Sequence, residues 1–280
     1  MSRLLSSLAS TTLVALTAVG ASAQSVSDIV DQMYDAYEAQ AAGVDNYTLV
    51  QTAMGMASTM YFEKEMVDGH PVFVSQGGSA QGANMNFGLG NQNGAMGDVY
   101  SIGPQLVEHA TYEGRESIDG VSVHVLAIDD LSQLPVVQDA APNEMEFKAK
   151  NGKIYVDAEL MVPRRIEFVG DATTPNGVHE VTIHIDQNDI RDVQGLLVPY
   201  HTTMQISGLQ AMIDPEMRAQ LEEMEQQLAA LPPEQREMME RMMGDQLEQL
   251  RQMAAGDSDA MSVEVTVDDV RVNAGPPSNE

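Results

Sequence analysis

The sequence contains no cysteine and no tryptophan, and only 5% of its residues are aromatic. Without cysteine the chain can form no disulfide, use no cysteine nucleophile and carry no lipid on a cysteine that follows a leader. Hydrophobic residues nevertheless make up 43% of the 280 residues, which is enough to bury a full-sized core. The protein is therefore expected to be globular and to be stabilised by that core alone.

Basic residues are scarce, because 14 lysine and arginine residues face 42 acidic ones, for a formal charge of -28 at pH 7. A field of this sign repels phosphate backbones and anionic lipid headgroups. The composition thus excludes nucleic acid as a partner and indicates that any contact with lipid is apolar. The acidity is also typical of a salt-adapted source, which says nothing about a binding site.

Long apolar runs are confined to the N-terminus. Arg3 is followed by an interrupted apolar stretch over 4–19 and by the small-x-small sequence ASA at 21–23. Residues 1–23 are therefore interpreted as a secretory signal peptide cleaved after Ala23, which predicts a periplasmic or secreted protein. An uncleaved anchor is the alternative. No later segment approaches the roughly 20 apolar residues of a membrane span, so no integral span is expected.

Motifs for catalysis or metal binding are missing. There is no G-x-S-x-G elbow and no phosphate-binding loop. The sequence HEVTIH places His179 and His184 five residues apart, whereas the zinc pattern needs two histidines four apart on a helix. An odd offset puts them on opposite faces of a strand. No catalytic residue, metal ligand or cofactor is assigned, and no enzyme is expected, although a hydrolase that uses an acid pair stays open.

One amphipathic helix is predicted near the start of the mature chain. Apolar residues recur at three-to-four spacing from Val26 to Tyr37, with Ser27 as the N-cap and Gly43 just past the end. The helix is expected over 25–42.

Beyond Asn46 the apolar period changes to two, which predicts strands. The turn sequences Asp68-Gly69, Ile118-Asp119-Gly120 and Asn151-Gly152 join consecutive strands in hairpins. A meander of about ten strands cannot stay flat, since twist curls it. The fold class is therefore α+β, with a curled antiparallel sheet, an incomplete barrel, that encloses helices or is covered by them. Strands are expected at 46–52, 58–67, 71–75, 106–117, 121–129, 144–150, 153–158, 164–169, 178–187, 197–207 and 261–273.

Two segments interrupt this pattern. Residues 75–97 are rich in Gly, Asn and Gln, which favours a flexible loop or a mobile lid over a cavity.

Residues 212–255 instead have helical spacing, with a stop at Pro232-Pro233, and predict a methionine-rich helical hairpin. Its apolar stripes either pack as ordinary core or lie over the mouth of the barrel, where flexible methionine side chains adapt to ligands. The candidate ligand-binding residues are Met217, Leu221, Met224, Leu228, Met239, Met242, Met243 and Leu247.

Four short phrases together resemble the periplasmic lipoprotein-sorting carriers of the LolA and LolB kind. They are YEGRESIDGVSVHVLAIDD (112–130), KIYVDAELMVPRRIEFVGD (153–171), NDIRDVQGLLVPYHTTMQ (188–205) and VTVDDVRVNAGPP (265–277). The resemblance implies an incomplete antiparallel barrel around helices, with an apolar cavity for acyl chains. The sequence departs from the family in one respect, since 212–255 stands where the closing strands would follow directly.

These observations predict a single carrier domain over 24–275, with 212–255 inserted in it and a disordered tail at 276–280. Its expected function is to hold the acyl chains of a lipid or lipidated protein, without catalysis. The alternative is a protein of the cell envelope that binds a protein partner through the methionine-rich hairpin.

Overall fold

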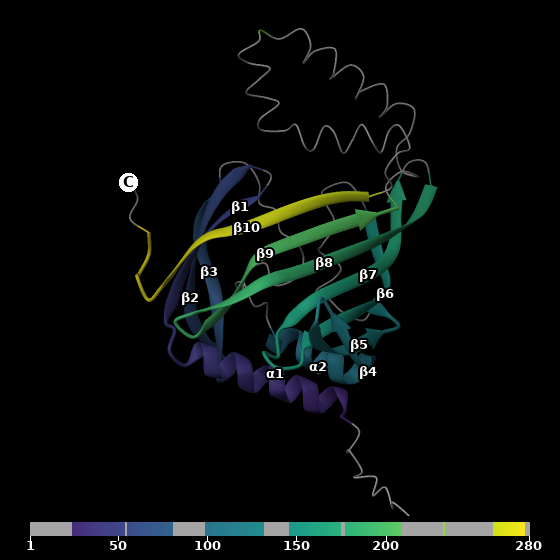
Figure 1. Cartoon of the computed structure of the whole chain (residues 1–280), viewed down its shortest axis with the longest axis horizontal. Coiled ribbons are helices and arrows are strands. Elements are labelled where there is room, and N and C mark those ends of the chain that lie inside the picture. Colours follow the sequence, from purple (N-terminus) through teal and green to yellow (C-terminus); the bar gives the residue numbers. More distant parts are fainter. Residues whose placement is uncertain are drawn as a thin grey trace, which may run out of the picture.

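The computed structural model describes residues 24–53, 55–80, 99–131, 146–174, 177–208, 232 and 260–277. Within them two helices accompany ten strands (Figure 1). The helices are α1 (Val26–Ala41) and α2 (Val99–His109). The strands are β1 (Asn46–Ala53), β2 (Met56–Val67), β3 (His70–Ala80), β4 (Ala110–Ile118), β5 (Val121–Ile128), β6 (Glu146–Asp157), β7 (Pro163–Thr174), β8 (Gly177–Val193), β9 (Leu196–Ser207) and β10 (Ala260–Val272).

All ten strands form one antiparallel sheet in the order β3-β2-β1-β10-β9-β8-β7-β6-β5-β4. Its two edge strands, β3 and β4, do not pair with each other, so the sheet is open. Helix α1 nevertheless contacts both edge strands, and it also packs on α2. A ten-stranded sheet can meet one helix with both edges only if it curls around that helix, as Figure 1 shows. The predicted curled antiparallel sheet is thus confirmed.

Two of the three predicted turn sequences connect strands as expected. Asp68 and Gly69 have φ values of 52° and 89°, and Asp119 and Gly120 have 50° and 84°. Positive φ at both central residues is the geometry of the two-residue hairpin turn that matches strand twist. These turns set the registers of the β2–β3 and β4–β5 pairs.

The third turn prediction is wrong, because Asn151-Gly152 lies inside the continuous strand β6. A Cβ atom on Gly152 would lie 2.4 Å from the carbonyl oxygen of Glu167 and 2.9 Å from the Phe168 ring. The glycine therefore permits a close approach of β7 rather than a change of direction. The pairing of β6 with β7 shifts register between Ala149 and Asn151, so this stretch forms an irregularity within the ladder.

The N-cap of α1 is Ser25 and not Ser27. The Ser25 hydroxyl accepts a hydrogen bond from the Asp28 backbone N–H, and the Asp28 carboxylate accepts one from the Ser25 backbone N–H. This reciprocal pair is a capping box, which requires an acidic or amide side chain three residues after the cap. Ser27 is followed at that distance by Val30, so it cannot form one.

Helix α2 replaces the first part of the strand predicted over 106–117. Leu106 is buried in the main core, and Gly103 lies so close to Tyr34 of α1 that an added Cβ would be 2.0 Å from the phenol oxygen. Packing against α1 therefore supports a helix in a segment whose local pattern is also compatible with a strand. The strand begins at Ala110. Strand β3 continues to Ala80, past the predicted start of the loop at 75, and 81–98 lies outside the described residues.

The C-terminal end of the sheet is joined to the connection between α1 and β1 by Asn273. Its side-chain oxygen accepts a hydrogen bond from the backbone N–H of Asp45 at 2.7 Å, and its side-chain nitrogen donates to the carbonyl of Gly43 at 2.9 Å. In turn, the side-chain oxygen of Asn46 accepts a hydrogen bond from the backbone N–H of Gly275. These bonds hold the two ends of the domain together. Residues 278–280 of the predicted tail lie outside the described part of the chain.

Candidate functional site

All eight candidate residues of the predicted hairpin, from Met217 to Leu247, lie outside the described residues. The structure does describe the strand ends on either side of that segment. Ser207 at the end of β9 pairs directly with Ala260 at the start of β10. Gly208, with φ of 90°, packs so tightly on β8 that a Cβ would lie 2.3 Å from the carbonyl oxygen of Glu180. The insertion therefore leaves and rejoins the sheet at one point.

The face of the sheet that turns toward the helices carries continuous apolar rows. Cross-strand pairing aligns one residue from each of six strands, and the resulting row contains only apolar side chains. The first row is Leu126, Ile154, Ile166, Ile185, Met204 and Val263, on β5 to β10. The row beside it is Ile128, Gly152, Phe168, Ile183, Ile206 and Met261. We call this surface the concave face. Five strand spacings make each row about 24 Å long.

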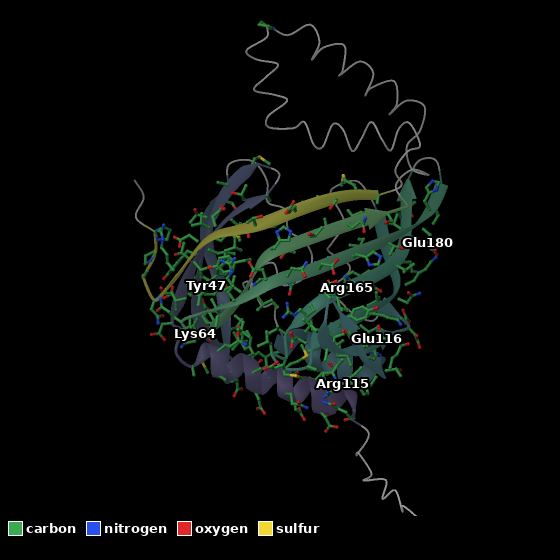
Figure 2. All side chains as sticks on the ribbon, in the orientation of Figure 1. Tyr47, Lys64, Arg115, Glu116, Arg165 and Glu180 are labelled. Carbon is green, nitrogen blue, oxygen red and sulfur yellow. The ribbon has the colours of Figure 1, made fainter. Side chains whose placement is uncertain are left out.

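Charged residues alternate with these rows and lie on the opposite, convex side of the same strands. Arg165 of β7 forms an ion pair with Asp186 of β8 (Figure 2). Glu167 accepts a hydrogen bond from the Tyr155 hydroxyl at 3.0 Å and lies 3.3 Å from His184. Because neighbouring residues of a strand point to opposite faces, this alternation separates a charged exterior from an uncharged interior. The high negative charge of the chain is thus kept off both rows.

Burial changes along the first row. Leu126 is fully buried and Ile185 is 9% exposed, whereas Met204 is only partly buried and Val263, at the β10 end, is 5% exposed. Met60 on β2 and Ile183 on β8 are likewise partly buried against the core. The part of the concave face near β8 to β10 and β2 is therefore the part that solvent reaches. Methionines are prominent there, as expected of a surface that adapts its shape.

The described helices do not pack evenly on this face. Helix α1 makes its main contacts with α2, β3, β4 and β9, and α2 makes its own with β4 and β5. The middle strands β6, β7 and β8 are not among these main contacts. Their concave side chains are large and apolar, including Ile154, Ile166 and Phe168. These side chains are only 6–7% exposed and belong to the same core cluster as Ile29 and Val30 of α1, so the centre of the concave face is part of the buried core.

At the β4–β5 end, one polar pair interrupts the apolar interior. His124 has no exposed surface, and its Nδ1 lies 3.1 Å from the Tyr112 hydroxyl. Its Nε2 is buried and has no hydrogen-bond partner among the described residues. Burial, together with the positive charge of Arg115, holds the pKa of His124 below its ordinary value. The imidazole is therefore neutral at neutral pH. The sequence reasoning did not single out this histidine, since only the fold shows that it is buried.

The described residues contain no group of three or more histidine and acidic side chains that could hold a metal ion. His179 and His184 are five residues apart along the continuous strand β8, so they lie on opposite faces. In the described part of the chain, neither helix has the length and apolar character that crossing a bilayer requires.

No family model matches the chain, and no curated protein matches its sequence. Several solved structures match its fold. A DUF1329 family protein from Desulfovibrio piger is 10% identical, with 90% of this chain and 93% of that one covered and a TM-score of 0.41. A domain from Vibrio parahaemolyticus, described as an outer membrane lipoprotein-sorting protein, is 9% identical, with 89% and 96% covered and a TM-score of 0.37.

A third match is the Mycobacterium tuberculosis lipoprotein LppX, which is 13% identical over 51% of this chain and 86% of that one, with a TM-score of 0.24. At identities of 9 to 13%, these likenesses say nothing about ligand or partner. The domain from Vibrio parahaemolyticus is, by its description, of the kind of protein that the sequence phrases resemble.

Proposed function

We propose that this protein is a non-catalytic lipid carrier of the cell envelope, which holds the acyl chains of a lipid or lipidated protein against its concave face. The observation that supports the proposal is the pair of apolar rows that cross six strands without a charged side chain. In a chain with a formal charge of -28, the partly exposed members of these rows, Ile183, Met204, Ile206 and Met261, offer an apolar ligand a surface without charge.

The dimensions of the rows suit an acyl chain. One leaflet of a bilayer has a hydrocarbon layer about 15 Å thick, half of the roughly 30 Å core, and each row is about 24 Å long. Each methylene removed from water contributes about 0.8 kcal/mol. A chain that lies along a row can therefore bind through apolar contact alone, and it needs no cationic site for its headgroup.

The partly buried methionines mark where the ligand enters under this proposal. Met204 is the partly exposed residue next to the end of the first row, which Val263 closes, and Met261 ends the second row, beside the point where the chain leaves the sheet after β9. The hairpin predicted over 212–255 then supplies further methionine side chains to the same ligand. Its candidate residues, such as Met239 and Met243, are proposed to cover the acyl chain.

Native mass spectrometry of the purified mature protein tests this function. The expected result is a protein with additional mass, and organic extraction of the same sample then identifies that mass as lipid. A protein that stays free of lipid after incubation with phosphatidylcholine vesicles would contradict the proposal.

The second candidate function is a protein-binding module of the envelope. The pairing of Ser207 with Ala260 favours it, because a segment that leaves and rejoins a sheet at one point can be an independent binding element. In this case the purified protein is free of lipid and retains one envelope protein in an affinity purification, and deletion of 212–255 abolishes that retention.

A further inference from the structure

The accessible part of the concave face carries two pairs of uncharged polar residues among its apolar side chains. Thr202 lies two residues before Met204 on β9, so it shares the same face, and it is paired across strands with Gln187 of β8. On the other side of β10, Gln51 of β1 is paired with Ser58 of β2. All four polar side chains are partly exposed. This surface therefore offers hydrogen-bonding groups as well as apolar contact.

The registers place both polar pairs on the same side of the sheet. Gln51 is two residues after the buried Leu49 on β1, and it is opposite Val267 of β10. Val265, two residues before Val267, is opposite Thr202 of β9. Because β10 lies between β1 and β9, the two pairs are separated by about 10 Å, which is two strand spacings. One compact headgroup can therefore lie between them and contact both.

The side chains of the two polar pairs are available to a ligand. Within the described part of the chain, none of the four forms a hydrogen bond through its side chain. A glutamine amide and a serine or threonine hydroxyl can each donate and accept a hydrogen bond, as a sugar hydroxyl does. A ligand with hydroxyl groups satisfies these side chains, whereas a ligand without them leaves partly buried polar groups unpaired.

Positive charge is missing from the row of side chains that runs through Thr202. Cross-strand pairing aligns this row from β2 to β8 as Met56, Ala53, Val265, Thr202 and Gln187. The next charged residues along β8 are Asp189 and Arg191, which form an ion pair with each other. A phosphate group on this row would meet no positive charge and would lie in the negative field of a chain with a formal charge of -28. An uncharged headgroup avoids that repulsion.

We propose that the concave face binds a lipid whose headgroup is uncharged and rich in hydroxyl groups, such as a glycosyl diacylglycerol, through the two polar pairs. This inference rests on the proposed lipid-carrier function and specifies its ligand class. The acyl chains lie against the partly exposed apolar side chains, such as Met204 and Ile206, and the headgroup forms hydrogen bonds beside them. A free sugar has the same hydroxyl chemistry but lacks the apolar contact, so it is expected to bind far more weakly.

The test compares three lipids that carry identical oleoyl chains. Monogalactosyl diacylglycerol has uncharged hydroxyl groups, phosphatidylcholine is zwitterionic and has no hydroxyl, and phosphatidylglycerol has hydroxyl groups and a negative charge. Competition for the purified mature protein is measured by native mass spectrometry. The galactosyl lipid is expected to be preferred over phosphatidylcholine by about tenfold, as one or two added hydrogen bonds provide. Phosphatidylglycerol is expected to bind most weakly, because the chain repels it.

Substitutions on β8 and β9 test the polar pair at that side. Thr202→Val removes a hydroxyl at nearly constant shape, and Gln187→Leu removes the amide. Each is expected to reduce the preference for the galactosyl lipid over phosphatidylcholine to about threefold, and the double variant is expected to abolish it. If the double variant does not fold, Gln51→Leu on β1 tests the second pair with the same expected reduction.

Matched controls lie on the convex side of the same strand. Thr203 and Gln205 alternate with Thr202 and Met204 on β9, so their side chains face away from the proposed ligand. Thr203→Val and Gln205→Leu make the same chemical changes there. Both controls are expected to keep the full preference for the galactosyl lipid.

Each outcome decides one question. Equal binding of the galactosyl lipid and phosphatidylcholine by the natural protein overturns the headgroup assignment and leaves the carrier function standing. A preference that survives in the double variant and in Gln51→Leu, or that the convex controls lose equally, also overturns the assignment. Displacement of the lipid by an equal concentration of methyl galactoside would identify a sugar site instead. If the natural protein binds none of the three lipids, the carrier function itself fails.

Discussion

Ser207 and Ala260 are paired across β9 and β10, although residues 208–259 separate them in the sequence. From Ser207 and Ala260 the β9–β10 ladder continues through the pair Met204–Val263 to the pair Thr202–Val265. Two strands that neighbour each other in this way need only a short connection. The intervening segment is therefore dispensable for the topology of the sheet, even though it contains a large share of the methionines.

Deletion of 212–255 is expected to leave a folded sheet with a strongly reduced lipid content. The physical reason is that the ends of β9 and β10 already lie side by side, while the proposed cover of the acyl chain is removed. Far-ultraviolet circular dichroism and a thermal melt check the fold, and native mass spectrometry checks the ligand. A deletion variant that fails to fold would instead show that the methionine stripes belong to the core.

A positive charge on the concave face is expected to prevent lipid binding. Met204→Lys places an ammonium group in the first apolar row, and we expect the lipid affinity to fall at least tenfold, which is about 1.4 kcal/mol. Its matched control is Thr203→Lys, one residue earlier on β9. Thr203 pairs with Asp186 on one side and Glu264 on the other, so a lysine there meets opposite charges on the convex side. Equal lipid binding by the two variants would contradict the proposed site.

Asp157 at the end of β6 provides a pH-dependent contribution to stability. Its carboxylate is almost completely buried and accepts hydrogen bonds from the backbone N–H groups of Glu159 and Leu160 and from Arg164, each at 2.9 Å. Burial raises the pKa of Asp157, but the bonds from Leu160, Glu159 and Arg164 outweigh it, and the net pKa is below the ordinary value. The contribution is thus present above about pH 4 and is lost as the pH falls through the lowered pKa.

The variant Asp157→Asn is expected to lose about 3 kcal/mol of unfolding free energy at pH 7, because Arg164 loses its charged partner in a mostly buried site. Urea unfolding between pH 7 and pH 3 measures this. The difference between the natural protein and the variant should be constant above about pH 5 and should shrink below about pH 4. A difference that does not change with pH would mean that the carboxylate contributes through packing and not through charge.

Gly152 and Gly43 are expected to respond oppositely to substitution by alanine. Gly152→Ala forces a Cβ atom against the Glu167 carbonyl and should cost about 1–3 kcal/mol. Gly43 has no heavy atom within 4 Å of a Cβ position and no left-handed backbone, so Gly43→Ala should be neutral or slightly stabilising, by about 0.5 kcal/mol. Thermal melts of the two variants compare them. Equal melting temperatures would contradict the close approach of β7 to β6.

The hairpins on either side of the main meander were predictable because their signals are local. Asp68-Gly69 and Asp119-Gly120 each place two residues at positive φ, which few other dipeptides tolerate, and alternating apolar residues flank them. Asn151-Gly152 has the same local signal and a different role. A glycine suits a tight turn and a close approach of two backbones equally well, and only the position of β7 distinguishes the two roles.

The candidate site was less accessible to prediction than the fold. The hairpin residues Met217 to Leu247 were chosen from their own spacing, and they remain a prediction. The rows through Met204 and Leu126 were not identified, because they depend on the registers of five strand pairs at once, and a shift of one residue in any pair breaks the alignment. The burial of His124 could not be predicted either, because the sequence pattern around a histidine in a strand does not show whether its face is buried or exposed.

The amino-acid sequence by itself determined that this chain forms a twisted antiparallel meander with an amphipathic helix. The reason is that the alternation of apolar residues and the turn-forming residues act through interactions between residues close in sequence. Tertiary structure decided that Val99–His109 is a helix, that β6 continues through Gly152, and that apolar residues from six strands align beside His124. These features arise from contacts between distant segments. Their free energy depends on which surfaces meet, which no local pattern specifies.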